Sequence, residues 1–296
     1  MKSVFTHTWT TSLLIILFSV FLTACGDSGT PPPPPSTSAS INGHAVKGPV
    51  GSGTVTAYAV RNGVLDGSLQ SAVTAEDGSY ALSVDDATSI VVLELTGGTY
   101  TNEATGDTGN IPPVVGGGLS AVITGVESGA VLNAEITPIT TMVVKRAQAM
   151  AGGLTLDNIR IANDEIWQYF FDGDNLTSTP PVDLRDTAAD LQNANQPEID
   201  YAFLLAGLTQ LASNMGWADA MNLVNAFVLD GADGIFDGLQ NGSAIVIDGI
   251  QLTSSSANED LAAAITEFGD INVTININID ITIINLLNGH ADVTPP

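Results

Sequence analysis

Two acidic turns carry the side chains with the clearest potential for metal chemistry. The first contains Asp172 and Asp174, and the second contains Asp230, Asp233 and Asp237. Because Ca²⁺ takes six to eight oxygen ligands from flexible loops, both turns are candidate calcium sites. Neither turn fits the EF-hand spacing, and Asp and Gly also end helices and form turns without any metal. Calcium is therefore the only cofactor that the sequence suggests, against the alternative that the chain binds none.

The sequence contains none of the motifs typical of nucleophilic or nucleotide-dependent catalysis, namely G-x-S-x-G, a P-loop or a dinucleotide fingerprint. His44 falls in the first expected strand and His290 in a polar tail, so we interpret both as surface or packing residues. A glycan hydrolase with paired carboxylates stays an alternative. Trp167 and Trp217 weaken it, because both fall in expected helices among apolar neighbours rather than on a sugar-stacking platform. We predict that the chain is not an enzyme.

Charge excludes one class of partner. The 296 residues include 7 Lys and Arg against 32 Asp and Glu, for a formal net charge of −25. Binding to nucleic acid requires clustered cations that neutralise phosphates, so we expect no nucleic-acid partner. The hydrophobic fraction of 44% is sufficient for real cores and excludes disorder throughout. The single cysteine excludes an internal disulfide bond.

That cysteine ends an N-terminal targeting signal. Lys2 precedes a nearly unbroken apolar run from Leu13 to Leu22, which is too short to cross a membrane as a helix. The run leads into Leu-Thr-Ala-Cys at residues 22–25, which resembles the lipobox of bacterial lipoproteins. The resemblance implies cleavage after residue 24 and lipidation of Cys25, and an ordinary secretory signal is the alternative. Gly26 rather than Asp follows the cysteine, which in that family favours the outer membrane.

We expect residues 25–40 to be a tether and residues 41–133 to form a β domain. Five prolines at 31–35 favour an extended polyproline II stalk. Beyond it, Thr54–Ala59 alternates polar and apolar residues, and Ile90–Leu95 is typical of a buried strand. Asn-Gly or Asp-Gly pairs at 62–63, 66–67 and 77–78 are predicted to close hairpins. Turns at such short intervals predict an antiparallel sandwich.

Three segments of this domain resemble the carboxypeptidase regulatory-like, or transthyretin-like, family. They are the run from Ile41-Asn42-Gly43 through Val46-Lys47-Gly48-Pro49-Val50, the segment Gly53–Tyr58, and the T-x-x-D-G-x-Y hairpin at 74–80. The resemblance covers about 60 residues and implies a β-sandwich, but it implies little about function. It implies no zinc peptidase, because the ligand spacing of such enzymes is missing. In the turn-rich loop that follows, Glu103 and Asp107 are possible ligands that we expect to be solvated.

From residue 134 to residue 269 the apolar period becomes helical. Pro138 after Thr137 predicts the start of the first helix, and further helices are expected near Asp157, at Pro197, around 221–231 and after Ser256-x-x-Glu259. Their aromatic and Met residues recur at core spacing, so we interpret them as packing residues. These helices predict a small bundle.

The last segment, 270–296, contains strict alternation over residues 271–283, with apolar residues at every odd position. Such a pattern predicts one long β-strand. A strand with a fully apolar face must be paired, either within the same molecule or with another chain.

Together these patterns predict an α+β multidomain protein: a transthyretin-like antiparallel β-sandwich, a helical bundle and a long C-terminal strand. The expected function is that of an outer membrane lipoprotein, held in the membrane by its N-terminal lipid. It would act as a non-catalytic binding or adhesion module, with the loops around 61–69 and 97–110 contacting an envelope protein or a glycan. The alternatives are an envelope assembly component that pairs through its C-terminal strand, and the glycan hydrolase.

Overall fold

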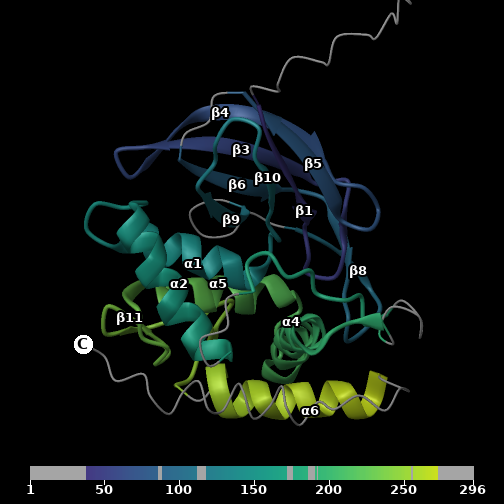
Figure 1. The fold of residues 1–296 in the computed structure, drawn as a ribbon. Coiled ribbons are helices and arrows are strands. Elements are labelled where there is room, and N and C mark those ends of the chain that lie inside the picture. The colour runs from purple at the N-terminus through teal and green to yellow at the C-terminus, as the bar shows by residue number, and fades with distance from the viewer. Residues whose placement is uncertain are drawn as a thin grey trace, which may run out of the picture. The chain divides into compact units, whose positions relative to one another are not determined.

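The computed structural model describes residues 38–85, 89–111, 118–171, 176–185, 191, 193–254 and 256–272. They form a mixed α/β structure in which strands come first and helices follow (Figure 1). Cys25, Asp172, Asp174, His290 and the stretch from residue 273 onward lie outside the described residues. The first ten strands are β1 (Ala39–His44), β2 (Val50–Gly51), β3 (Thr54–Arg61), β4 (Val64–Val73), β5 (Ser79–Val84), β6 (Ile90–Thr96), β7 (Thr99–Thr101), β8 (Thr108–Asn110), β9 (Leu119–Thr124) and β10 (Val131–Asn133).

The strand pairs are mostly antiparallel, as the turn spacing predicts. One sheet has the order β4-β3-β6-β9, and two smaller sheets have the orders β10-β1-β5 and β2-β7-β8. One pair departs from the prediction, because β10 runs parallel to β1 with Leu132 opposite Ile41. Strand β1 begins at Ala39, before the expected boundary at residue 41, because Ala39 is fully buried and pairs with Val84.

One of the three predicted hairpins is confirmed, one is a tight turn between strands of different sheets, and one is wrong. Asn62 and Gly63 join β3 to β4 with φ angles of 53° and 77°, the positive values that the tightest hairpin turns require. Asp77-Gly78 forms a tight turn, in which the amide of Gly78 donates to the carbonyl of Ala75, but this turn joins β4 to β5, which pair with different strands. Asp66 and Gly67 lie inside β4, where the register with β3 shifts. That Gly (φ 74°) belongs to a β-bulge and not to a hairpin turn.

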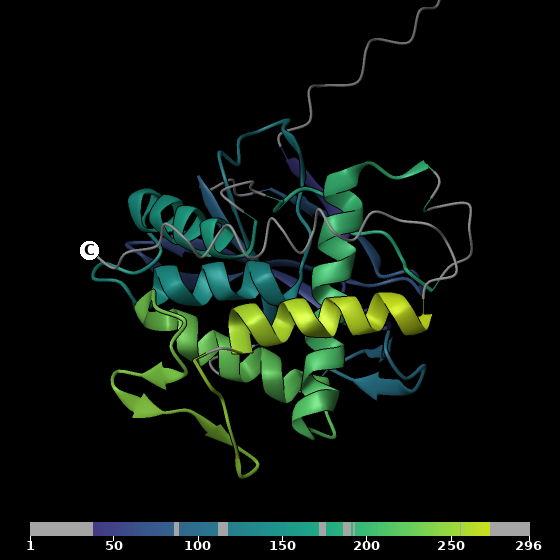
Figure 2. The ribbon, with the colours of Figure 1, turned by 90° about the horizontal axis from the view of Figure 1, so that it is seen from below.

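Five helices follow within the described ranges: α1 (Pro138–Ala149), α2 (Leu156–Phe171), α4 (Gln196–Met215), α5 (Ala220–Asp230) and α6 (Leu261–Asn272). The predicted start of α1 is confirmed, because the Thr137 side chain accepts a hydrogen bond from the amide of Thr140 and Pro138 is the first helical residue. Figure 2 shows α6 running across α4. Their contact includes Phe203 and Phe268, whose rings meet edge to face at 6.1 Å.

Strands and helices share one continuous apolar core. Helix α1 lies against β9, and the amide of Ser120 donates to Thr141 Oγ1 at 2.8 Å across this contact. The predicted packing role of the aromatic residues is confirmed for Trp167 and Tyr201, which are buried with their rings 5.6 Å apart. All described residues belong to a single compact unit, whereas the sequence predicts a domain boundary near residue 133.

The segment between α5 and α6 holds short strands that the sequence analysis did not predict: β11 (Leu239–Gln240), β12 (Ser243–Ala244), β13 (Val246–Ile247) and β14 (Ile250–Gln251). A π-helical turn, Ser256–Asp260, then leads into α6. The predicted C-terminal strand is wrong at its first two residues, because Ile271 and Asn272 end α6. Its remaining residues lie outside the described ranges. In the part of the chain that the structure describes, no helix has the length and apolar character needed to span a membrane.

Candidate functional site

An open pocket of about 270 Å³ lies where the strands meet the helices, and we name it the junction pocket. One wall comes from β1, the turn after it, the 74–80 turn and the 102–107 turn. This wall consists of His44, Val46, Gly48, Pro49, Asp77 and Glu103. The pocket therefore uses the same Val46–Val50 and 74–80 segments that carry the family resemblance.

The other wall comes from α4 and from the extended segment that precedes it. It consists of Val182, Asp183, Leu184, Glu198, Ala202 and Leu205, with Pro180 and Pro181 at its edge. Glu198 is fixed by the capping box of α4, where its Oε2 accepts the amide of Asn195 at 2.9 Å. The two walls combine an apolar surface with a few charged groups, which is the usual character of a ligand site.

His44 is the titratable residue of this pocket with a raised pKa. Its Nδ1 lies 3.2 Å from Glu135 Oε2, and its amide donates to the same oxygen at 2.8 Å. Glu135 is buried, whereas 42% of the His44 side chain is exposed. The hydrogen bond to Glu135 raises the pKa of His44, although burial of the ring opposes the shift. The prediction that His44 lies in the first strand is confirmed, and the protonated ring forms a neutral pair with Glu135.

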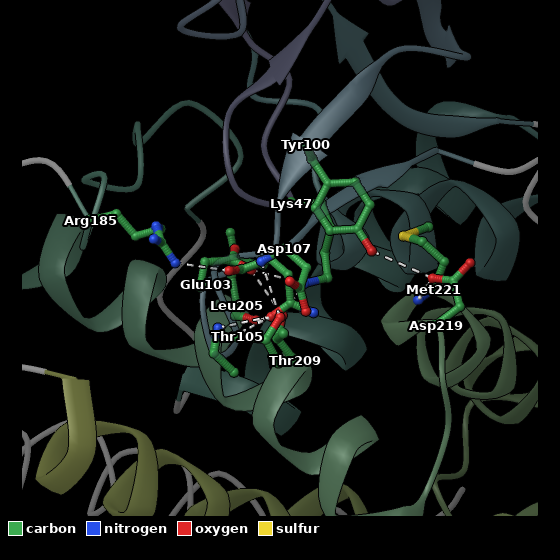
Figure 3. A network of polar contacts seen from close by, with 12 residues as sticks. Lys47, Tyr100, Glu103, Thr105, Asp107, Arg185, Leu205, Thr209, Asp219 and Met221 are labelled. Carbon is green, nitrogen blue, oxygen red and sulfur yellow. Dashed lines mark hydrogen bonds and ion pairs between the residues drawn. The ribbon is translucent and has the colours of Figure 1, made fainter.

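A buried ion pair joins Glu103, which lines the pocket, to Lys47 (Figure 3). The ammonium group of Lys47 is fully buried and lies 3.3 Å from Glu103 Oε2, and it also donates to Thr209 Oγ1 on α4. The hydroxyl of Thr209 donates in turn to Glu103 Oε2 at 3.0 Å. Glu103 is only 7% exposed. The expectation that Glu103 is solvated is therefore wrong, because it faces a lysine that the sequence places 56 residues away.

Aromatic and polar contacts continue this network on its other side. Tyr100 is buried, and its ring centroid lies 5.6 Å from Lys47 Nζ. Its hydroxyl lies 3.4 Å from Asp219 Oδ1, and burial raises the pKa of Tyr100. A second, more polar pocket of about 340 Å³ includes Tyr100, Asp107, Thr209 and Asp219. Glu103 lines one pocket and Thr209 the other, so the ion-pair network separates the two.

The 97–110 segment, which we expected to contact a ligand, packs against this chain's own helix. A residue outside this segment also stabilises its turn, because Arg185 Nη1 donates to the carbonyl of Asn102 at 3.1 Å (Figure 3). Asp107 is exposed, as expected. Residues 61–69 form the β3–β4 turn and the start of β4, with Val64 and Leu65 exposed. No local sequence pattern predicts the junction pocket, because it requires residues from segments far apart in the chain.

The second acidic turn is organised by hydrogen bonds to its own backbone. Asp230 Oδ1 accepts the amides of Asp237 at 3.2 Å and Gly238 at 2.9 Å. Asp233 accepts from Ile235, and Asp237 accepts from Leu239. No group of three His, Cys, Asp or Glu side chains in the described ranges is placed to hold a metal ion.

Trp167 lies in α2 as predicted, but the expectation that Trp217 is helical is wrong. Trp217 follows the left-handed cap Gly216 that ends α4. Its ring is 95% buried, and its Nε1 donates to the carbonyl of Ile247 at 3.0 Å. It therefore joins α4 to the β13–β14 hairpin.

Comparison with known proteins gives no match: no family model, no curated protein and no solved structure is significantly similar to this chain.

Proposed function

We propose that this chain is a lipid-anchored protein of the bacterial cell envelope that binds its ligand, without catalysis, in the junction pocket. The observation that carries the proposal is the pocket itself, whose walls come from the strands and from α4. A site at such a junction is typical of ligand-binding proteins. The ligand would be an envelope protein or a glycan, and the lipid on Cys25 would hold the protein in the outer membrane.

We propose further that the strands form a transthyretin-like sandwich followed by a helical bundle. The antiparallel order β4-β3-β6-β9 and the separate β10-β1-β5 sheet support a two-sheet arrangement. Gly48 supports the resemblance at the Val46–Val50 motif. It has a φ angle of 68°, and a Cβ there would lie 2.3 Å from the carbonyl oxygen of Thr101. Only glycine allows this turn to approach the 97–110 segment so closely.

Membrane attachment is tested at Cys25. Cys25→Ser should abolish incorporation of labelled palmitate, because the thiol is the group that would carry the lipid. Two or three acyl chains hold a protein firmly in a membrane. Wild-type protein recovered from the medium with an unmodified cysteine would contradict the proposal.

The pocket is tested by filling it. Val182 is partly buried on the α4 wall, so Val182→Trp should occupy the cavity without entering the core. We expect the full chain to bind members of an array of envelope glycans and peptides, and Val182→Trp to reduce those signals at least about tenfold, since a filled site excludes its ligand.

The matched control is Val246→Trp, which adds the same side chain at an exposed position on β13, outside the pocket. This variant should bind like the wild type. If Val182→Trp and wild type give the same signals, or if neither binds, the junction pocket is not the ligand site.

A further inference from the structure

The charges on the junction pocket do not cancel. Glu103 is paired with Lys47, and His44 is paired with Glu135 behind it. Three lining carboxylates then remain, those of Asp77, Asp183 and Glu198. Within the described part of the chain none of the three forms an ion pair, and no Lys or Arg is among the residues that line the pocket. The pocket therefore has an excess of negative charge.

Backbone amides hold each of these three carboxylates in place. Asp77 Oδ1 accepts the amide of Ser79 at 2.9 Å, Asp183 Oδ1 accepts the amide of Arg185 at 2.9 Å, and Glu198 is held by its capping box. Hydrogen bonds from Ser79 also lower the pKa of Asp77, so this group is ionised at neutral pH. The guanidinium of Arg185 is directed to the carbonyl of Asn102 and does not line the pocket. These carboxylates are thus positioned before any ligand arrives.

The rest of the lining is aliphatic. Val46, Val182, Leu184, Ala202 and Leu205 lie between the carboxylates, on both walls. At about 270 Å³ the cavity lies just below the usual range for drug-sized ligands, about 300–1,000 Å³, so it fits a group the size of one long side chain. A bare metal ion would leave the aliphatic walls uncovered.

From these walls we infer that the junction pocket recognises an organic cation, a primary amine or a guanidinium at the end of a short aliphatic chain. A Lys or Arg side chain of a partner protein has this chemistry, and so does a free amine. The aliphatic part would contact Leu205 and its neighbours, while the cation would meet Asp77, Asp183 and Glu198. This inference rests on the proposed function, because it assigns a ligand class to the same pocket.

Calorimetric titration of the full chain with matched probes tests the ligand class. The cations are 1,5-diaminopentane, butylguanidine and acetyl-Gly-Lys-Gly-amide. The neutral counterparts are 1,5-pentanediol, butylurea and the same peptide with an acetylated lysine. We expect each cation to bind at least about tenfold more tightly than its neutral counterpart. Stronger binding of the peptide than of the diamine would identify a protein partner as the source of the cation, and the reverse order would identify a free amine.

Isosteric amides isolate the role of the three carboxylates. Asp77→Asn, Asp183→Asn and Glu198→Gln each keep the oxygen that accepts the backbone amide and remove only the charge. Each should weaken cation binding roughly threefold, as expected for a partly exposed ion pair, and the triple variant roughly thirtyfold. The control triple Glu127→Gln, Asp157→Asn, Asp248→Asn removes the same charge from exposed positions outside the pocket. It should change the affinity less than twofold.

Each contrary result has a distinct meaning. Equal weakening by the two triple variants would overturn the inference, because diffuse surface charge would then account for binding. If neutral probes bind as tightly as the cations and Val182→Trp abolishes both, the pocket remains a ligand site but its ligand is not a cation. If no cation binds while the array signals remain sensitive to Val182→Trp, the inference fails and the proposed function stands. If no cation binds and the array signals are not sensitive to Val182→Trp, both the inference and the proposed function fail.

Discussion

Lys47→Met is expected to lower the free energy of unfolding by about 3–5 kcal/mol, the range typical of removing one partner from a buried ion pair. The ammonium group is fully buried and Glu103 is 7% exposed, so the variant leaves a carboxylate in the core without its counter-charge. Thr209 keeps one hydrogen bond to that carboxylate but supplies no charge. Urea unfolding of the full chain, followed by tryptophan fluorescence, measures the change.

Two further variants separate the ion pair from general effects of substitution. Lys47→Met combined with Glu103→Leu should recover much of the loss, because an apolar pair of similar volume replaces two charges. Arg160→Ala breaks the Arg160–Asp164 pair, whose side chains are 66% and 68% exposed, and it should cost no more than about 0.5 kcal/mol. If Lys47→Met costs no more than Arg160→Ala, the buried pair does not contribute to joining the 97–110 segment to α4.

The sequence could not predict this pair, because its members meet only through the tertiary fold. Lys47 lies 56 residues from Glu103 and 162 residues from Thr209. Locally, Glu103 stands among Thr, Asn and Gly, a composition typical of an exposed loop. The only signal was Lys47 itself, a lone cation between Val46 and the Gly-Pro turn. The structure explains this lysine, because Gly48 lets the turn pack closely against Thr101, near Glu103.

Features set by neighbouring residues were predicted well. Thr137 and Pro138 fix the start of α1. The Thr137 side chain accepts a hydrogen bond from a free backbone amide, and the ring of Pro138 holds the backbone at a helical φ angle. The 3.6-residue period likewise predicted a helix near Asp157, and Ile159, Ala162 and Ile166 form part of the buried face of α2. Such signals act within one or two turns of chain, so no knowledge of the tertiary structure is needed.

Features that depend on the pairing partner were not predicted. Asp66-Gly67 has the composition of a hairpin turn, but Asn62-Gly63 closes the hairpin four residues earlier and leaves Gly67 inside β4. The residues around Trp217 are helical in composition, yet the left-handed Gly216 ends α4 just before it. The junction pocket could not be predicted for the same reason, because its two walls come from segments that are far apart in the chain.

Asp230→Asn is expected to stabilise the protein at pH 8 and to have almost no effect near pH 4. Burial raises the pKa of Asp230 to about 7, well above its ordinary value, even though the amides of Gly238 and Asp237 oppose the shift. The folded state then binds the proton more tightly than the unfolded state, so this group's stabilising contribution is fully present below about pH 4. It is lost as the pH rises through about 7. The rise of the pKa from its ordinary value to about 7 corresponds to at most about 4 kcal/mol, and we expect about 2–3 kcal/mol of this to be measured.

Asparagine keeps the Oδ1 atom that accepts the two amides and removes the charge that burial penalises. Urea unfolding at pH 8 and pH 4 should therefore show a gain of about 2–3 kcal/mol at the higher pH only. Asp248→Asn, at an exposed position, should change stability by less than about 0.5 kcal/mol at both pH values. The same variant decides the calcium hypothesis for this turn. If Asp230, Asp233 and Asp237 held Ca²⁺, added calcium would raise the melting temperature of the wild type, and Asp230→Asn would lower stability at pH 8 instead of raising it.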